Sequence, residues 1–187
     1  PSLPNLSSVF FAGAFLLLAA ACSGKSAVDE VNPFIGTAAH GHVYPGATVP
    51  FGMVQLSPDT RDNTWDGSSG YHYSDTSILG FSMNHLTGTG CPDLGNIMMI
   101  PTVGTLKLVP GDKPGDGYRA SFSHADEISR PGYYSVYLPD YKVKVELTAT
   151  ARAGFSRYTF PATTEAHVVV DLQHGIGNNV TEAQLTI

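Results

Sequence analysis

The sequence predicts an all-β fold, an antiparallel β-sandwich, and three observations support this prediction. Only 14% of the 187 residues are charged, whereas 20 are Gly and 13 are Pro, a composition typical of turn-rich β proteins. The second half of the chain contains short segments of alternating apolar and polar residues, separated by turn residues at intervals expected for a sandwich. No amphipathic helix longer than a turn or two is indicated.

The chain starts with an apolar run, Val9–Ala21, of 13 residues. This length suits the core of a signal peptide better than a membrane span. Three alanines end the run and lead into Cys22, Ser23 and Gly24, a pattern that resembles a bacterial lipoprotein signal. The alternative is an ordinary secretory signal with an incidental cysteine.

These features predict three segments: a lipoprotein-like signal peptide over residues 1–21, a tether over 22–27 and a partial N-terminal β-sandwich domain over 28–187. Cys22 is the predicted lipidation site, so we expect a protein anchored to a membrane by lipid, in the bacterial periplasm or on the cell surface. Because the chain begins at Pro rather than Met, and Ala183–Ile187 resembles the first half of a strand, we expect a piece of a longer gene product.

The clearest predicted strand is Tyr141–Ala151, where apolar residues alternate strictly with Lys, Glu and Thr. That period of two indicates a half-buried antiparallel strand. Ala166–Leu172 is more continuously apolar and is predicted to be buried on both faces, whereas Asp75–Asn84 is ambiguous. The remaining predicted strands are Val103–Val109, Tyr133–Leu138, Gly154–Phe160 and an edge strand, Val49–Leu56, interrupted by Pro50 and Gly52.

The stretch Ser57–Asn96 is long, polar and rich in Gly, which is typical of functional or disordered loops. It also contains too many large apolar side chains for a solvated linker. We therefore predict an ordered loop system that presents aromatic, His and Asp groups. Such a set suits sugar recognition, because an aromatic face packs on a pyranose while carboxylates and imidazoles bind its hydroxyls.

Four residues of this stretch are individual candidates for substrate binding. Trp65 is the predicted sugar platform, and Asp66 beside it can bind hydroxyls, although Asp66-Gly67 is most simply a turn. The alternative for Trp65 is a loop anchor that packs with Tyr71 and Tyr73. For His72 and His85, a substrate contact and a hydrogen-bonded structural role are equally open.

Other chemistries are disfavoured. The net charge of −6 and the lack of a basic run argue against a nucleic-acid partner. His40 and His42 have no third ligand at metal-binding spacing, which favours a structural or pocket-rim role and no metal site in this chain. Cys91 is predicted to be a buried free thiol. Asp59, in a Ser-Pro-Asp-Thr segment, is predicted to cap a turn.

Several motifs occur together from about Val28 to the end of the chain: VNPFIGT, YPGATVPFGMVQLSPD, GYHYSD, GFSMNHLTGTGCPDLGNI, FSHADE and PGYYSVYL. They resemble the N-terminal domain of glycoside hydrolase family 92. The resemblance implies exo-acting bacterial α-mannosidases that act on mannose-containing glycans, N-glycans and yeast mannan, mostly on α-1,2 linkages, with inversion and a calcium ion. It also implies that the sandwich packs against a C-terminal helical domain that this chain lacks.

According to the resemblance, the missing helical domain carries most calcium ligands and the pair of carboxylic acids, ~6.5–9.5 Å apart, that an inverting glycosidase needs. No catalytic residue is therefore assigned in this chain. Asp93 falls where the family has an acidic turn near the domain interface and is a further substrate-binding candidate. We expect the chain to supply pocket loops to a secreted α-mannosidase. The alternatives are a stand-alone carbohydrate-binding sandwich without catalysis and a structural or adhesive sandwich.

Overall fold

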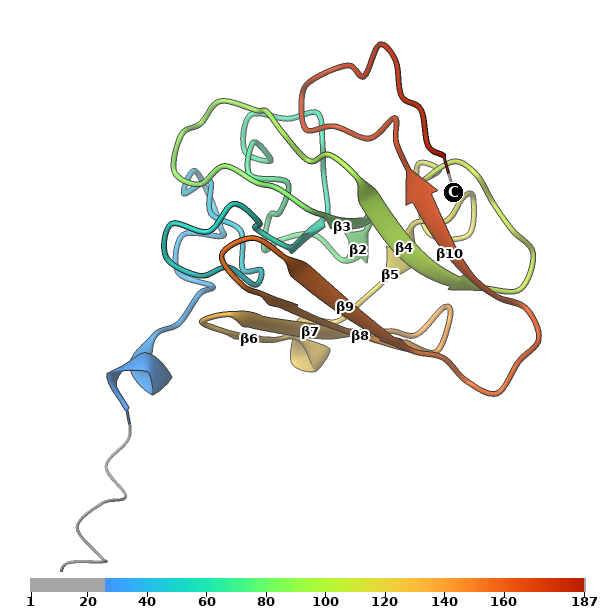
Figure 1. Ribbon diagram of the computed structural model, residues 1–187, viewed down its shortest axis with the longest axis horizontal. Helices are drawn as coiled ribbons and strands as arrows, with labels where there is room; N and C mark the ends of the chain where they lie inside the picture. Colours follow the sequence, from blue (N-terminus) through green and yellow to red (C-terminus); the bar gives the residue numbers. More distant parts are fainter. Residues whose placement is uncertain (1–25, 187) are drawn as a thin grey trace, which may run out of the picture. The chain divides into compact units, whose positions relative to one another are not determined.

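The computed structural model describes residues 26–186 of the chain, which divides into two compact units, Pro1–Val31 and Asn32–Ile187 (Figure 1). In the first unit, the described residues form one 3-10 turn, η2 (Ala27–Glu30), whose N-cap is Ser26. The predicted signal peptide and Cys22 lie outside the described residues. No helix within residues 26–186 is long and apolar enough to cross a membrane.

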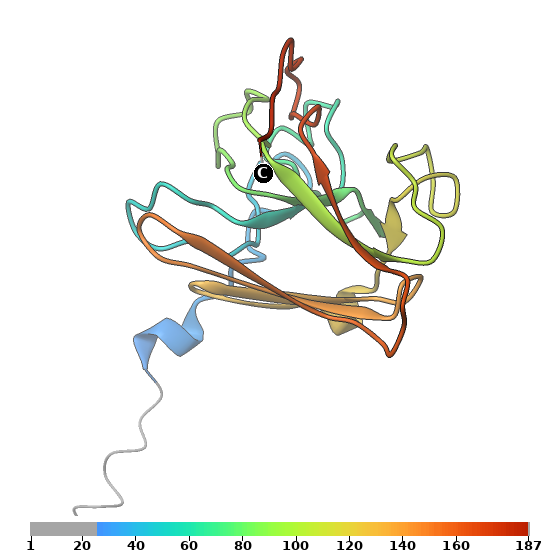
Figure 2. The ribbon, with the colours of Figure 1, turned by 45° about the vertical axis from the view of Figure 1, so that its right-hand side comes forward.

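The second unit is built from antiparallel sheets, and Figure 2 shows the two larger ones facing each other as layers. The first has the order β1 (Ser57–Asp59), β3 (Gly80–Ser82), β4 (Met98–Val103), β10 (Ala166–Asp171). The second is a meander of β6 (Ile128–Arg130), β7 (Tyr133–Leu138), β8 (Val143–Ala149) and β9 (Gly154–Thr159). A two-stranded sheet pairs β2 (Ser77–Ile78) with β5 (Ala120–Ser121), and η3 (His124–Asp126) is a second 3-10 turn. The all-β sandwich prediction is confirmed.

The core lies between the layers and follows the alternation of the meander. In β8 the side chains of Val143, Val145 and Leu147 are buried, and Val145 pairs with Val136 of β7 on one side. They belong to the same buried cluster as Phe81 of β3. Because an apolar residue at every second position places one face of the strand in the core, the predicted strands of the meander match the observed ones closely.

Three strand predictions were wrong. Val103–Val109 is not a strand, because β4 ends at Val103 and the chain then turns at Gly104, which has a φ of +90°. Within Val49–Leu56 only Leu56 forms a bridge, with Ala47. Ala166–Leu172 is not buried on both faces, since β10 pairs with β4 alone among the described strands and exposes Val168 and Val170. Residues 183–186 also form no strand.

Four loop segments gather in the second unit, and we call them the loop face: residues 36–44, 60–75, 84–96 and 172–178. Backbone hydrogen bonds connect them, from Tyr73 N to Thr37 O (2.8 Å), Gly88 N to His42 O (2.6 Å), Gly177 N to Asp62 O (2.7 Å) and Ile176 N to Leu94 O (2.9 Å). Segments far apart in sequence thus form one ordered surface, as predicted for the central stretch.

Candidate functional site

Trp65 lies on the loop face with 57% of its surface exposed. Its ring contacts two imidazoles: His42 at 4.4 Å between centroids, edge to face, and His40 at 5.1 Å. His40 Nδ1 lies 2.5 Å from Asp66 Oδ1, and this hydrogen bond lowers the pKa of Asp66. The structure therefore brings an accessible indole, a carboxylate and two imidazoles together. Tyr71 donates to Glu127 and Tyr73 stacks on His124.

Within this group, His42 has a buried polar atom without a hydrogen-bond partner among the described residues. Its side chain is buried, its φ is +53°, and its Nε2 has no partner among residues 26–186. Buried polar atoms in folded proteins are nearly always hydrogen-bonded to protein or water. Gly90 lies against this ring, and a Cβ there would come within 3.1 Å of His42 Nδ1. The pocket-rim role predicted for His42 is compatible with this position.

His72 connects two segments of the loop face. Its Nε2 lies 3.2 Å from the carbonyl oxygen of Ala39, and its Nδ1 lies 2.8 Å from Ser74 Oγ. Its backbone N–H donates to Thr60 Oγ1, which in turn donates to Asp75. Burial opposes ionisation of Asp75, but donation by Arg61 and Thr60 outweighs burial and lowers the pKa of Asp75. His72 therefore holds the loop that carries Trp65.

Below this surface, Asp59 is fully buried between two imidazoles. Its Oδ1 lies 2.7 Å from His85 Nε2 and its Oδ2 lies 3.0 Å from His174 Nε2. Burial alone would raise the pKa of Asp59, yet the two imidazoles hold it at about 2. His85 Nδ1 also faces the carbonyl oxygen of Gln55 at 2.7 Å. Both ring nitrogens of His85 therefore lie within hydrogen-bonding distance of an acceptor.

The turn-cap prediction for Asp59 was wrong. Asp59 ends a buried strand, β1, and its side chain connects segments 26 and 115 residues away. The neighbouring backbone must come close, and Gly70 permits this with a φ of +83°. A Cβ at Gly70 would come within 2.2 Å of Asp59 Oδ1. His85 is likewise buried, which places it in the framework of the loop face rather than on its surface.

A second buried carboxylate, Glu127, attaches the loop face to the meander. Its oxygens accept hydrogen bonds from Tyr71 (3.0 Å), Tyr134 (2.5 Å) and His124 (2.5 Å). Burial and the charge of Glu127 raise the pKa of both phenols, so they remain donors. His124 in turn stacks on the exposed ring of Tyr73, with centroids 4.1 Å apart.

Asp93 is exposed on the same loop as Gly90. Its Oδ1 accepts from the backbone N–H of Leu94 (2.8 Å) and from Asn178 (3.1 Å), and these two donors lower the pKa of Asp93. Cys91, beside it, is exposed, so the prediction of a buried thiol was wrong. The turn around Pro92 projects from the loop face instead of packing into the core.

Sequence reasoning missed His174, Glu127 and His124. His174 lies near the C-terminal end of the chain, with no partner close in sequence. Its role depends on a contact with Asp59 that only the fold creates. The motif FSHADE contains His124 and Glu127, spaced three residues apart around a 3-10 turn, and this spacing is the one local signal for their ion pair.

Comparisons with known proteins place these features in context. The model of the glycosyl hydrolase family 92 N-terminal domain matches residues 30–187. The alpha-mannosidase BT3965 of family GH92 from Bacteroides thetaiotaomicron superposes with a TM-score of 0.80 at 46% identity, over 81% of this chain and 21% of that one. The GH92 inverting mannosidase BT2199 from the same organism gives a TM-score of 0.65 at 30% identity, over 79% of this chain and 20% of that one.

An uncharacterized secreted glycosidase from Arthroderma benhamiae is 32% identical over 136 residues. That match covers 70% of this chain and 17% of the relative. The chain therefore spans about a fifth of the length of the proteins that it matches.

Proposed function

Because the chain belongs to glycoside hydrolase family 92 as its N-terminal domain, we propose that it is the N-terminal part of an enzyme that hydrolyses α-linked mannose in glycans. The observation that carries this proposal is the exposed Trp65, set among His40, His42 and Asp66 on an ordered loop face. The similarity to solved α-mannosidases supports the substrate class.

Within the complete enzyme, the loop face is proposed to form one wall of the sugar pocket. The indole of Trp65 would stack on the leaving-group sugar, and Asp66 would bind its hydroxyls. His72 holds the Trp65 loop in place from the side, and Asp93 stands at the rim. These roles require binding and orientation only, so they fit a domain that supports catalysis without performing it.

Three carboxylates in the loop face or directly below it are already engaged. Asp59 is buried between two imidazoles, Asp75 pairs with Arg61, and Asp66 pairs with His40. None is arranged with a second free carboxylate as general acid and base. The acid–base pair of the proposed inverting reaction, on α-1,2-linked or other α-linked mannose, is therefore assigned to the helical domain outside this chain.

The same reasoning applies to calcium. Residues 26–186 contain no group of three or more His, Cys, Asp or Glu side chains that could hold a metal ion. The described residues therefore offer no such cluster for calcium, so we derive no step through the metal and propose that it binds in the helical domain.

The test uses the full-length gene product with an aryl α-mannoside and α-1,2-mannobiose. We expect hydrolysis of both, with β-mannose as the first product by NMR, and no turnover by the 187-residue chain alone. A full-length protein that binds mannan but releases no mannose would support the carbohydrate-binding alternative. Turnover by the isolated chain, with an extract lacking the gene as control, would contradict the assignment of the acid–base pair.

Location is a separate proposal, supported by the sequence around Cys22 and by the secreted relative. We propose a secreted protein that is anchored by lipid at Cys22. One acyl chain binds a membrane only marginally, so stable anchoring takes more than one. Cys22→Ala should release the full-length protein into the soluble fraction. A wild-type protein that is soluble and carries no acyl group by mass spectrometry would exclude the anchor.

A further inference from the structure

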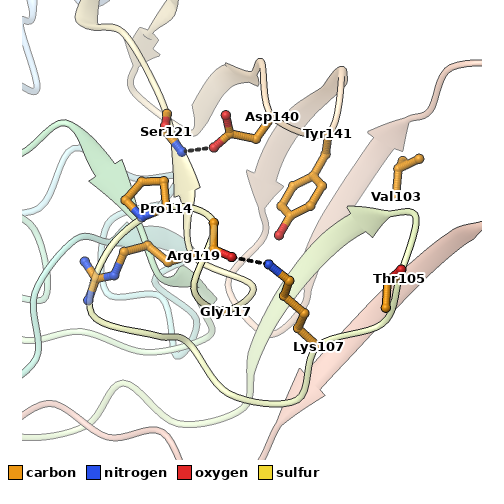
Figure 3. A pocket seen from close by; sticks show the side chains of 10 residues that line it. Val103, Thr105, Lys107, Pro114, Gly117, Arg119, Ser121, Asp140 and Tyr141 are labelled. Atoms are coloured by element: carbon orange, nitrogen blue, oxygen red, sulfur yellow. Dashed lines mark hydrogen bonds between the residues drawn. The ribbon is translucent and has the colours of Figure 1, made fainter.

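A surface hollow of about 520 Å³ lies between the loop that follows β4 and the turn between β7 and β8 (Figure 3). Its volume falls within the ~300–1,000 Å³ of small-ligand sites. None of its lining residues belongs to the loop face, although the side chain of Arg119 donates to the carbonyl oxygen of Thr60 there (3.2 Å). The residues used below are Thr105, Lys107, Arg119, Ser121, Asp140 and Tyr141.

Four polar groups around the hollow have unused hydrogen-bonding capacity. The ammonium of Lys107 donates to the carbonyl oxygen of Gly115, which leaves two of its three N–H groups. Asp140 accepts from the backbone N–H of Ser121 through Oδ2, and its Oδ1 has no partner among the described residues. The hydroxyls of Thr105 and Ser121 also have none within residues 26–186. The hollow therefore offers donors and acceptors together.

The ring of Tyr141 forms a wall of the hollow, and its hydroxyl is fixed by donation to the carbonyl oxygen of Tyr118 at 2.9 Å (Figure 3). A phenol held in this way keeps its ring in a fixed orientation and retains acceptor capacity. Aromatic walls of this kind pack on the apolar face of a sugar ring, while hydroxyl and charged groups around them bind its hydroxyls.

Charge decides which class of ligand fits. The guanidinium of Arg119 points away from the hollow and donates to the carbonyl oxygens of Gly111 and Thr60 and to Ser77 Oγ. Lys107 is therefore the lining cation whose free N–H groups remain near the hollow, and Asp140 balances its charge. Balanced charge with free hydroxyls disfavours a phosphate or carboxylate and favours a neutral polyhydroxyl ligand.

We propose that this hollow is a second, non-catalytic saccharide site that holds another part of the mannose-rich glycan on which the enzyme acts. The choice of glycan rests on the proposed function, whereas the neutral saccharide class rests on the hollow itself. Such a site would increase retention on a long or branched substrate without altering cleavage of a small one, because linked binding events reinforce each other.

The test compares full-length protein with two variants by affinity electrophoresis in native gels cast with yeast mannan and run in the cold. The double variant Thr105→Val/Lys107→Met removes two free polar groups and preserves their approximate shape. The matched control is Lys113→Met, which removes the same charge from an exposed position of the same loop, outside the hollow. Thermal midpoints and near-UV circular dichroism establish that each variant is folded.

We expect the double variant to lose retention on mannan about fivefold or more, as for loss of hydrogen bonds to a charged group, with Lys113→Met close to wild type. The kcat/KM of the double variant for an aryl α-mannoside should equal that of the wild type. Three results would overturn the site. The wild type and the double variant could be retained equally, Lys113→Met could lose as much retention as the double variant, or the wild type could show no retention. A protein that hydrolyses no mannoside, but whose retention still depends on Thr105 and Lys107, would contradict the proposed function and leave this site standing.

Discussion

The loop face and the meander β6–β9 are two ordered regions of the same unit, but different interactions hold them. The meander depends on alternate apolar residues such as Val145 and Leu147, which pack between the layers. The loop face depends on buried charge, with Asp59 between His85 and His174, and Glu127 between two phenols and His124. The apolar region is tolerant of small changes of shape, whereas the polar region requires every partner to be present.

Removal of one buried partner should therefore have the largest effect. Asp59→Ala leaves two buried imidazoles without their carboxylate and should cost about 3–5 kcal/mol, as for other broken buried ion pairs. Hydrogen exchange of the full-length protein should show loss of protection over residues 60–75, 84–96 and 172–178, with β7 and β8 little changed. Asp66→Ala, which removes an exposed partner of His40, is the control and should leave the exchange unchanged. Uniform loss across the unit would remove the distinction between the regions.

Leu147→Ala tests the other region. It removes fully buried apolar volume and should cost ~2–5 kcal/mol. Because Leu147 lies in the core between both layers, the loss of protection should extend over the meander and β4 together. A loss of hydrogen-exchange protection that is confined to the loop face in Leu147→Ala would contradict the comparison. Thr148→Ala, at an exposed neighbouring position of β8, is the control.

The pH dependence of stability sharpens the comparison further. Burial opposes the charge on His174, but the contacts with Asp59 prevail and raise the pKa of His174 above its ordinary value. Its contribution is therefore complete below about pH 6.5 and is lost as the pH rises through the raised pKa. The contribution of Asp59, with its pKa of about 2, is present above about pH 4 and is lost on acidification.

We expect the thermal midpoint of the wild type to fall above neutral pH by more than that of His174→Asn, because only the wild type loses the charge on residue 174. The control is His167→Asn, which replaces a β10 histidine whose side chain hydrogen-bonds to the carbonyl oxygen of Gly104, and it should retain the wild-type profile. Parallel profiles for wild type and His174→Asn would show that Asp59 and His174 are not coupled through charge.

The same contrast explains what could be predicted from the sequence. Period-two alternation located β7, β8 and β9 to within two residues at each end, because one strand face sets the pattern locally. It failed for Val103–Val109, where Leu106 and Leu108 alternate but face solvent. The continuous apolar run of Ala166–Leu172 predicted burial on both faces, whereas β10 is an edge strand among the described strands. Composition does not distinguish an interior strand from an edge strand when the pairing partner is far away in the sequence.

The exposed part of the candidate site could be predicted from the sequence, whereas the buried side-chain contacts below it could not. A lone Trp among polar residues indicated that the Trp65 ring is accessible, and the structure shows an exposed ring. The Asp59–His174 contact spans 115 residues and leaves no local signature. Cys91 was misjudged for a similar reason, because exposure of the turn at Pro92 is set by how residues 174–178 pack against the loop.

The most direct test of the account is the contribution of Trp65 to sugar binding in the full-length enzyme. An aromatic contact of this kind is worth roughly 1–2 kcal/mol, so Trp65→Ala should lower kcat/KM for α-1,2-mannobiose about tenfold or more. Trp65→Phe, which retains an aromatic face, should lose less. An activated aryl mannoside, whose leaving group depends little on the neighbouring subsite, should be cleaved by both variants nearly as well as by wild type. Unchanged kcat/KM for both substrates, together with a thermal midpoint lowered by several degrees, would instead make Trp65 an anchor of the loop face and contradict its role at the sugar site.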